Sequence, residues 1–113
     1  MLSIHSFTAE LNGHRRPWSV GFSYSRDDRL ALLMIRAMSG DRTILVGENQ
    51  PYAVDDFTDY TIPVHGEAHG LPHVLIEIRQ DLIARQVGVT EWARRLADVF
   101  KQIEPAALQL TEN

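Results

Sequence analysis

The chain has 113 residues, of which 44% are hydrophobic and 23% charged, as in a single soluble globular domain and unlike a disordered chain. A formal net charge of -4 argues against nucleic-acid binding, and the lack of cysteine excludes disulfides, thiol catalysis and cysteine zinc sites. No apolar run approaches the length of a membrane span and the start does not resemble a signal peptide, so we expect a cytoplasmic protein.

The first 24 residues predict two strands joined by a polar loop. Residues 2–8 have the composition of a strand, and residues 20–24 alternate as a second, shorter strand does. The loop over residues 9–19 contains Asn12-Gly13, a strong turn signal. Because a domain rarely opens on what reads as an interior strand, we expect the chain to begin inside a larger protein.

A helix and a third strand follow. Ser25 is the expected N-cap, with Asp28 three residues later as an approximate capping box, and Gly40 is the expected end. Residues 43–47 predict the third strand, and residues 48–72 form a long polar segment of the kind that is often functional. The apolar stripe of the helix consists of Leu30, Leu33, Met34, Ala37 and Met38.

The last part of the chain predicts a strand and a second helix. Residues 73–83 are apolar and β-branched, as in a strand buried on both faces. A turn near Gly88 is expected to precede a helix capped by Thr90 and closed by Pro105, with residues 108–113 frayed. The expected buried face of this helix consists of Trp92, Leu96, Val99, Phe100 and Ile103.

Strands that alternate with amphipathic helices indicate an α/β domain, with a mixed or mostly parallel sheet and flanking helices. We treat residues 1–113 as one domain unit. Two helices are too few to cover both faces of such a sheet, which again suggests that the chain is a portion of a larger domain.

Glu77 and Arg79 interrupt the apolar strand over residues 73–83. They are two residues apart, so both side chains project from the same face. Ions on a buried face are costly unless they are paired or used in a reaction. Glu77 is therefore the first candidate for catalysis, and a structural Glu77–Arg79 ion pair on a partly exposed strand is the alternative.

The histidines are weaker candidates. His5, at the centre of the first strand, could bind zinc, or it could be a histidine hydrogen-bonded inside the sheet. His65, His69 and His73 recur every four residues, but intervening glycines and a proline argue against a helix that would align them. We interpret His69 and His73 as surface residues and leave the role of His65 open.

Two further segments offer polar side chains. Asn49 and Tyr52 follow the third strand and could orient a polar substrate, although Asn-x-Pro is also ordinary turn chemistry. Arg16 could present a guanidinium to a substrate carboxylate, with a solvated surface arginine as the alternative.

Together these segments are more specific than any one of them. Residues 2–8, 16–21, 47–52, 65–67 and 75–83, taken in this order, resemble the N-formylglutamate amidohydrolase family. The resemblance implies a zinc-dependent hydrolase of the phosphorylase/hydrolase-like, zinc carboxypeptidase-like fold. Its small-molecule substrate would be an N-acylated acidic amino acid, such as the N-formyl-L-glutamate of histidine degradation, which is cleaved to formate and glutamate.

The resemblance also implies roles for individual residues. His5 would be the last protein ligand of Zn²⁺, and Glu77 would be the general base and proton shuttle. The residues implied in substrate binding are Arg79, Arg16, Asn49 and Tyr52.

One part of the family pattern has no counterpart here, namely the earlier half that carries the first histidine and the acidic ligand of the zinc site. We therefore expect residues 1–113 to be a carboxy-terminal portion that is inactive in isolation. The alternative is a non-catalytic α/β remnant that self-associates, or binds a protein partner, through the sheet edge left by the missing strands.

Overall fold

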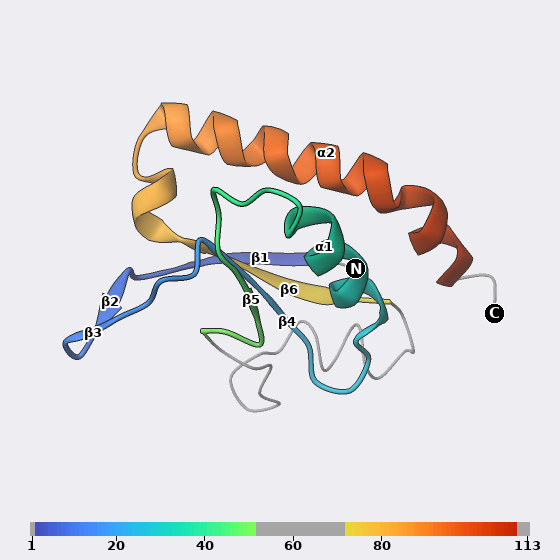
Figure 1. Ribbon diagram of the computed structural model, residues 1–113, viewed down its shortest axis with the longest axis horizontal. Coiled ribbons are helices and arrows are strands. Elements are labelled where there is room, and N and C mark those ends of the chain that lie inside the picture. Colours follow the sequence, from blue (N-terminus) through green and yellow to red (C-terminus); the bar gives the residue numbers. More distant parts are fainter. Residues whose placement is uncertain (1, 52–71, 111–113) are drawn as a thin grey trace.

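A computed structural model describes residues 2–51 and 72–110, which form a sheet with helices packed against it (Figure 1). The predicted α/β class is confirmed. The elements, in chain order, are β1 (Leu2–Phe7), β2 (Glu10–Leu11), β3 (His14–Arg15), β4 (Val20–Ser23), α1 (Arg29–Met38), β5 (Val46–Glu48), β6 (Val74–Arg79), the 3₁₀ helix η3 (Gln80–Ile83) and α2 (Gln86–Leu110).

The main sheet has the strand order β1-β6-β4-β5. β1 runs parallel to β6 and β4 runs parallel to β5, whereas β4 and β6 are antiparallel. The sheet is therefore mixed, as predicted. β6 lies between two neighbours, and β1 and β5 are the edge strands of the sheet that the described residues form.

β6 owes its central place to its apolar composition. Val74, Ile76 and Ile78 alternate along it and point into the same core as Val20 and Phe22 of β4. The predicted strand over residues 73–83 was too long, because the chain turns into η3 after Arg79. The strand therefore ends just beyond the two charged side chains.

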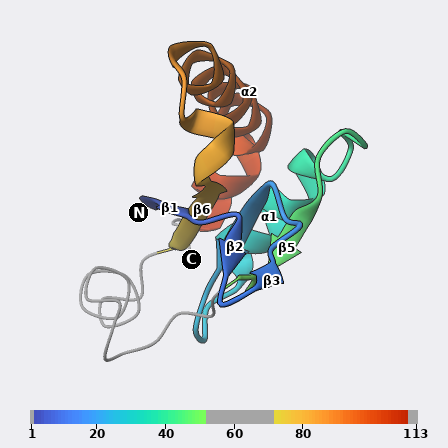
Figure 2. The ribbon, with the colours of Figure 1, turned by 90° about the vertical axis from the view of Figure 1, so that its left-hand side faces the viewer.

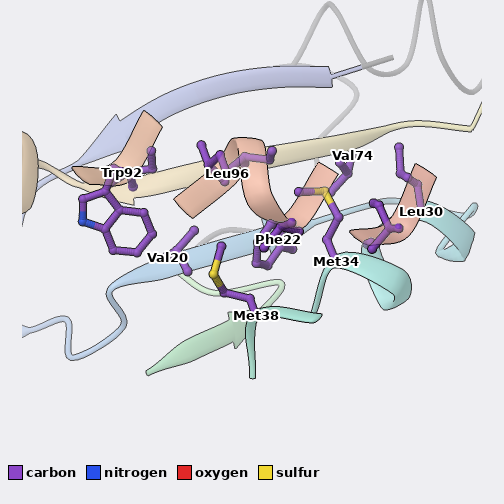
Figure 3. Packing of buried hydrophobic residues seen from close by; sticks show 13 residues of the cluster. Val20, Phe22, Leu30, Met34, Met38, Val74, Trp92 and Leu96 are labelled. Atoms are coloured by element: carbon purple, nitrogen blue, oxygen red, sulfur yellow. The ribbon is translucent and has the colours of Figure 1, made fainter. Parts of the chain in front are cut away.

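Both long helices pack against this core and against each other (Figure 2). Figure 3 shows Met34 of α1 and Leu96 of α2 directed toward Phe22 of β4. Burying a side chain of this size stabilises the fold by about 1.5–3 kcal/mol. Most of the two predicted stripes is buried, but Leu33, Ala37 and Phe100 are only partly buried, and Ala31 is buried although it was not predicted. The helical residues buried in the core are Leu30, Ala31, Met34 and Met38 of α1, and Trp92, Leu96, Val99 and Ile103 of α2.

The start of α1 differs from the prediction. The helix begins after Asp28, not after Ser25, and the Asp28 side chain makes no capping hydrogen bond. The Asp27 carboxylate accepts the backbone N–H of Arg29 at 3.1 Å and pairs with the Arg29 guanidinium. A carboxylate one residue before the N-cap thus satisfies an orphan donor of the first turn.

α2 is longer than predicted at both ends. It starts at Gln86, so the turn expected near Gly88 and the cap expected at Thr90 were wrong, and it continues through Pro105. A β-carbon on Gly88 would lie 2.0 Å from the Leu82 carbonyl oxygen, so this glycine lets the first turn of α2 pack closely on η3. Pro105 removes one helical hydrogen bond, which the packing of its neighbours on the core outweighs.

Local turn chemistry explains the remaining boundaries. Asn12 and Gly13 both have positive φ, at 53° and 80°, and connect β2 to β3 as the Asn-Gly signal predicted. β5, which corresponds to the strand predicted over residues 43–47, starts later than expected. The reason is that Asp41 accepts hydrogen bonds from the backbone N–H and hydroxyl of Thr43 and holds that residue in a turn. Among the described residues, none of the helices is both long and apolar enough to cross a bilayer.

Candidate functional site

Glu77 and His5 meet on the face of the sheet opposite the helices. They are partners in the parallel pairing of β6 and β1, so their side chains project to the same side. His5 Nδ1 lies 3.6 Å from Glu77 Oε1. The Glu77 side chain is only 5% exposed and that of His5 is 54% exposed, so the pair joins a buried carboxylate to an accessible imidazole.

The His5 ring has a second polar neighbour. Its Nε2 lies 3.3 Å from the Ser3 hydroxyl, which is two residues earlier on the same face of β1. The ring is therefore held between a hydroxyl and a carboxylate. The sequence named both His5 and Glu77, but only the register of β1 against β6 brings them together.

On the other flank of Glu77, the sheet carries a glycine. Gly21 is the partner of Glu77 on β4, and a β-carbon there would lie 1.8 Å from the Gln50 carbonyl oxygen. A β-carbon on Gly47 would lie 2.9 Å from Gln50 Cβ. The Gln50 backbone therefore rests on two glycines, directly beside Glu77.

Sequence reasoning missed this contact. The available signal was a glycine at the middle of each of two short apolar strands, which often marks a close backbone approach. The approaching segment could not be identified without the tertiary structure.

Arg79 lies two residues beyond Glu77, roughly 7 Å along the strand. Its Nε and Nη2 donate to the two carboxylate oxygens of Asp81 at 2.6 and 3.2 Å, and its Nη1 donates to the Pro17 carbonyl at 3.1 Å. The hydrogen bond from Arg79 lowers the pKa of Asp81. Among the described residues, the ion pair of Arg79 is therefore with Asp81, which disfavours the alternative of a structural Glu77–Arg79 pair.

Arg16 and Arg79 lie around the same surface depression, which has a volume of about 420 Å³. The Arg16 guanidinium donates to the Thr8 hydroxyl at 3.3 Å and lies 6.0 Å from the centre of the Phe7 ring. The depression is lined by Ala9, Arg15, Arg16, Pro17, Arg79 and Asp81. Three guanidinium groups and one carboxylate give it an excess of positive charge.

Asn49 occupies a turn at the end of β5. Its φ is 55°, a left-handed conformation that asparagine tolerates better than most residues, and its Oδ1 accepts the backbone N–H of Tyr24 at 2.9 Å. The Tyr24 hydroxyl donates to Glu48 at 2.5 Å, and this bond is the main reason why the pKa of Tyr24 is raised. The Asn49 side-chain amide oxygen is thus engaged in a contact between the ends of β5 and β4. The predicted substrate contact Tyr52, the histidine His65, whose role was left open, and His69, which was expected at the surface, lie outside the described residues.

The prediction that His73 is a surface residue was wrong. His73 is fully buried at the start of β6. The pKa of Asp27 is lowered mainly by its hydrogen bond with Arg29 and, in smaller part, by the charge of His73. The central position of β6 in the sheet explains the error, because residues flanking a central strand are enclosed by its neighbours.

The side chains that could hold a metal are of types that bind zinc, but they are too few to form a catalytic zinc site. Imidazole nitrogen and carboxylate oxygen are both zinc ligands, and a catalytic zinc takes three protein ligands. Within residues 2–51 and 72–110, no group of three or more histidine, aspartate or glutamate side chains converges as a metal site would. His5 is the accessible donor, and Glu77 lies beside it.

Comparison with known proteins gives the family. The family model described as N-formylglutamate amidohydrolase matches residues 1–84. The chain belongs to this family. The matched residues run from β1 through η3 and include His5, Glu77 and Arg79, so the resemblance seen in the sequence is confirmed. A search of curated proteins found no match.

A solved structure extends the comparison. The crystal structure of the gene product Atu2144 from Agrobacterium tumefaciens is 32% identical and superposes with a TM-score of 0.82. The match covers 99% of this chain and 43% of that one, so our chain spans less than half the length of the Agrobacterium protein. α2, beyond the family match, is therefore part of the shared fold.

Proposed function

We propose that this chain supplies part of the active site of an amidohydrolase that cleaves an N-acylated acidic amino acid, with N-formyl-L-glutamate as the substrate. The observation that carries the proposal is the pairing of buried Glu77 with accessible His5 on adjacent parallel strands. Both residues lie within the family match. The reaction would yield formate and glutamate and would belong to cytoplasmic histidine degradation.

Glu77 is the proposed general base. Its carboxylate would take a proton from the water that attacks the formyl carbon and would pass that proton to the amine nitrogen as the carbon–nitrogen bond breaks. Glu77 is held in the central strand β6, and the Gln50 backbone lies on Gly21, the partner of Glu77 on β4. A general base that is held in place in this way needs little reorganisation during the reaction.

His5 is the proposed zinc ligand of this chain. Zn²⁺, when bound, would lower the pKa of a water molecule and polarise the amide carbonyl. Its further protein ligands would come from outside the described residues. The accessibility of the His5 ring supports this assignment, because a histidine buried in the sheet could not reach an added metal.

Arg79 and Arg16 are the proposed partners of the substrate carboxylates. The depression that they line is positively charged, and guanidinium groups bind carboxylates in a planar, bidentate manner. Asp81 engages Nε and Nη2 of Arg79 and so orients its guanidinium at this depression. Asn49 and Tyr52 remain proposed orienting contacts.

The test uses a chimaera, because the chain alone spans only 43% of the Agrobacterium protein. In the chimaera, this chain replaces the part of the Agrobacterium protein that it matches, and formate release from N-formyl-L-glutamate is measured. Glu77→Gln keeps the shape of the side chain and removes the base, so we expect kcat to fall by about 10²–10⁴-fold with zinc content unchanged. Glu10→Gln, an exposed carboxylate on β2, is the matched control and should leave kcat unchanged.

Near-normal kcat in the Glu77→Gln chimaera would make Glu77 structural. A folded, zinc-loaded chimaera without any formate release would favour the second candidate, a non-catalytic α/β module. That candidate rests on the absence of a complete ligand set among residues 2–51 and 72–110.

A further inference from the structure

One carboxylate lies in the positively charged depression that Arg16 and Arg79 line. It belongs to Asp81, whose side chain is 52% exposed. A negative charge repels an acidic ligand, so the charge of Asp81 by itself disfavours the substrate proposed above. The contacts of Asp81 show what this side chain contributes instead.

Asp81 holds one edge of the Arg79 guanidinium. Nε and Nη2 of Arg79 donate to its two carboxylate oxygens, and Nη1 donates to the Pro17 carbonyl oxygen at 3.1 Å. The backbone N–H of Arg79 donates to the Ser19 carbonyl oxygen at 3.0 Å. A guanidinium that makes two parallel hydrogen bonds to a carboxylate, and a third at Nη1, has a fixed plane. Arg79 is therefore oriented before any ligand binds.

The same contacts leave donors for a ligand. A guanidinium has five N–H donors. Within residues 2–51 and 72–110, the hydrogen bonds of the Arg79 side chain use three of them, one on each nitrogen. One N–H on Nη1 and one on Nη2 remain. Ordering a flexible arginine during binding lowers affinity roughly two- to tenfold, and a guanidinium that is already ordered avoids this loss.

We propose, resting on the proposed substrate role of Arg79, that Asp81 is a positioning residue that raises the affinity of the depression for carboxylates despite its own negative charge. It acts through Arg79 and does not contact the substrate. The gain from orientation exceeds the repulsion, because Asp81 is half exposed and salt and water screen its charge. Its hydrogen bonds, in contrast, act directly on the group that binds the ligand.

The chain offers a matched control for this contact. Asp27 and Arg29 have the same two-residue spacing, and Nε and Nη2 of Arg29 donate to the Asp27 carboxylate at 2.9 and 2.6 Å. Neither residue lines the depression. Asp27→Asn therefore removes one negative charge and breaks the same kind of ion pair elsewhere. Urea denaturation of the Asp27 and Asp81 variants measures any loss of stability separately from binding.

The experiment uses the chimaera described above and glutarate, a dicarboxylate that contains no amide to hydrolyse. Isothermal titration calorimetry gives Kd for glutarate, and formate release gives KM and kcat for N-formyl-L-glutamate. In Asp81→Asn we expect Kd and KM to rise about two- to tenfold with kcat unchanged, because the ground state and the transition state lose the same binding contribution. Asp81→Ala should give the same rise. Asp27→Asn should leave all three constants unchanged.

The Arg79→Ala background tests whether Asp81 acts through Arg79. In that background Asp81→Asn removes only the repulsion, so Kd for glutarate should stay the same or fall. A rise in Kd of the same size with and without Arg79 would overturn the proposal. A lower or unchanged Kd in Asp81→Asn alone would also overturn it, as would a folded chimaera that does not bind glutarate.

The proposed reaction and the proposed role of Asp81 can fail separately. Glutarate binding that depends on Asp81, in a chimaera that releases no formate, would support the role of Asp81 and count against the reaction. Formate release with an unchanged KM in Asp81→Asn would support the reaction and overturn the role of Asp81.

Discussion

The two faces of the central strand β6 have different compositions and different tasks. Toward the helices, Val74, Ile76 and Ile78 are buried among apolar side chains and supply stability. On the other face, Glu77 lies beside His5, and Arg79 pairs with Asp81. The face toward the helices obeys the rule that buried residues are apolar, and the opposite face breaks it. Chemistry in a folded chain is expected at such exceptions.

The largest effect on stability should come from the apolar face. Phe22 is fully buried between the sheet and the helices, so Phe22→Ala should lower the free energy of unfolding by about 3–5 kcal/mol. Urea denaturation followed by circular dichroism measures this change. Glu77→Gln, on the opposite face, should shift the unfolding midpoint far less, and an equal loss for both variants would erase the contrast between the faces.

A smaller loss is expected where the Gln50 backbone lies on the sheet. Gly21→Ala forces a β-carbon against the Gln50 carbonyl oxygen, and relieving that clash should cost about 1–3 kcal/mol. In the chimaera the same change should also impair turnover, because the displaced backbone adjoins Glu77. Gly40→Ala is the control, since the nearest atom to its β-carbon would be 3.8 Å away. Equal stability of Gly21→Ala and Gly40→Ala would show that the close approach of Gln50 to Gly21 does not restrict the residue at position 21.

The pH dependence of stability should reveal an ionic contact remote from both faces. Hydrogen bonds from Thr43, and then from Arg95, lower the pKa of Asp41 to about 2 from 3.8. Because the folded-state pKa lies below the unfolded value, this contribution is complete above pH 3.8 and is lost as the pH falls toward 2. The urea midpoint should therefore decline over this window, and less steeply in Asp41→Asn. If the urea midpoint declined equally with pH in the original chain and in Asp41→Asn, the result would argue against the hydrogen bonds to Asp41.

The smallest signal is expected from zinc added to the isolated chain. One accessible imidazole with a neighbouring carboxylate falls short of three protein ligands, so dialysed protein should retain much less than one zinc per chain. Elemental analysis gives the ratio of zinc to protein, and His5→Ala should remove the zinc that remains after dialysis. Stoichiometric zinc would mean that residues outside the described part, such as His65, or a second subunit complete the site.

Local signals predicted much of the fold. The Asn12-Gly13 turn, the apolar stripe of α1 and the presence of a buried strand around Glu77 all follow from turn chemistry and side-chain periodicity. Boundaries were less accurate where a contact outweighed a local preference. Gly88 and Pro105 lie within α2, since packing on η3 and on the core extends the helix past both residues.

By itself the sequence determined the residue types of the site, the family and the α/β class, because these depend on pattern and order along the chain. The tertiary structure alone decided that His5 faces Glu77, that Arg79 pairs with Asp81 and that His73 is buried. It also placed the Gln50 backbone on Gly21. The physical reason is strand order: β1, at the start of the chain, pairs with β6, and no local preference encodes a register between segments so far apart in the sequence.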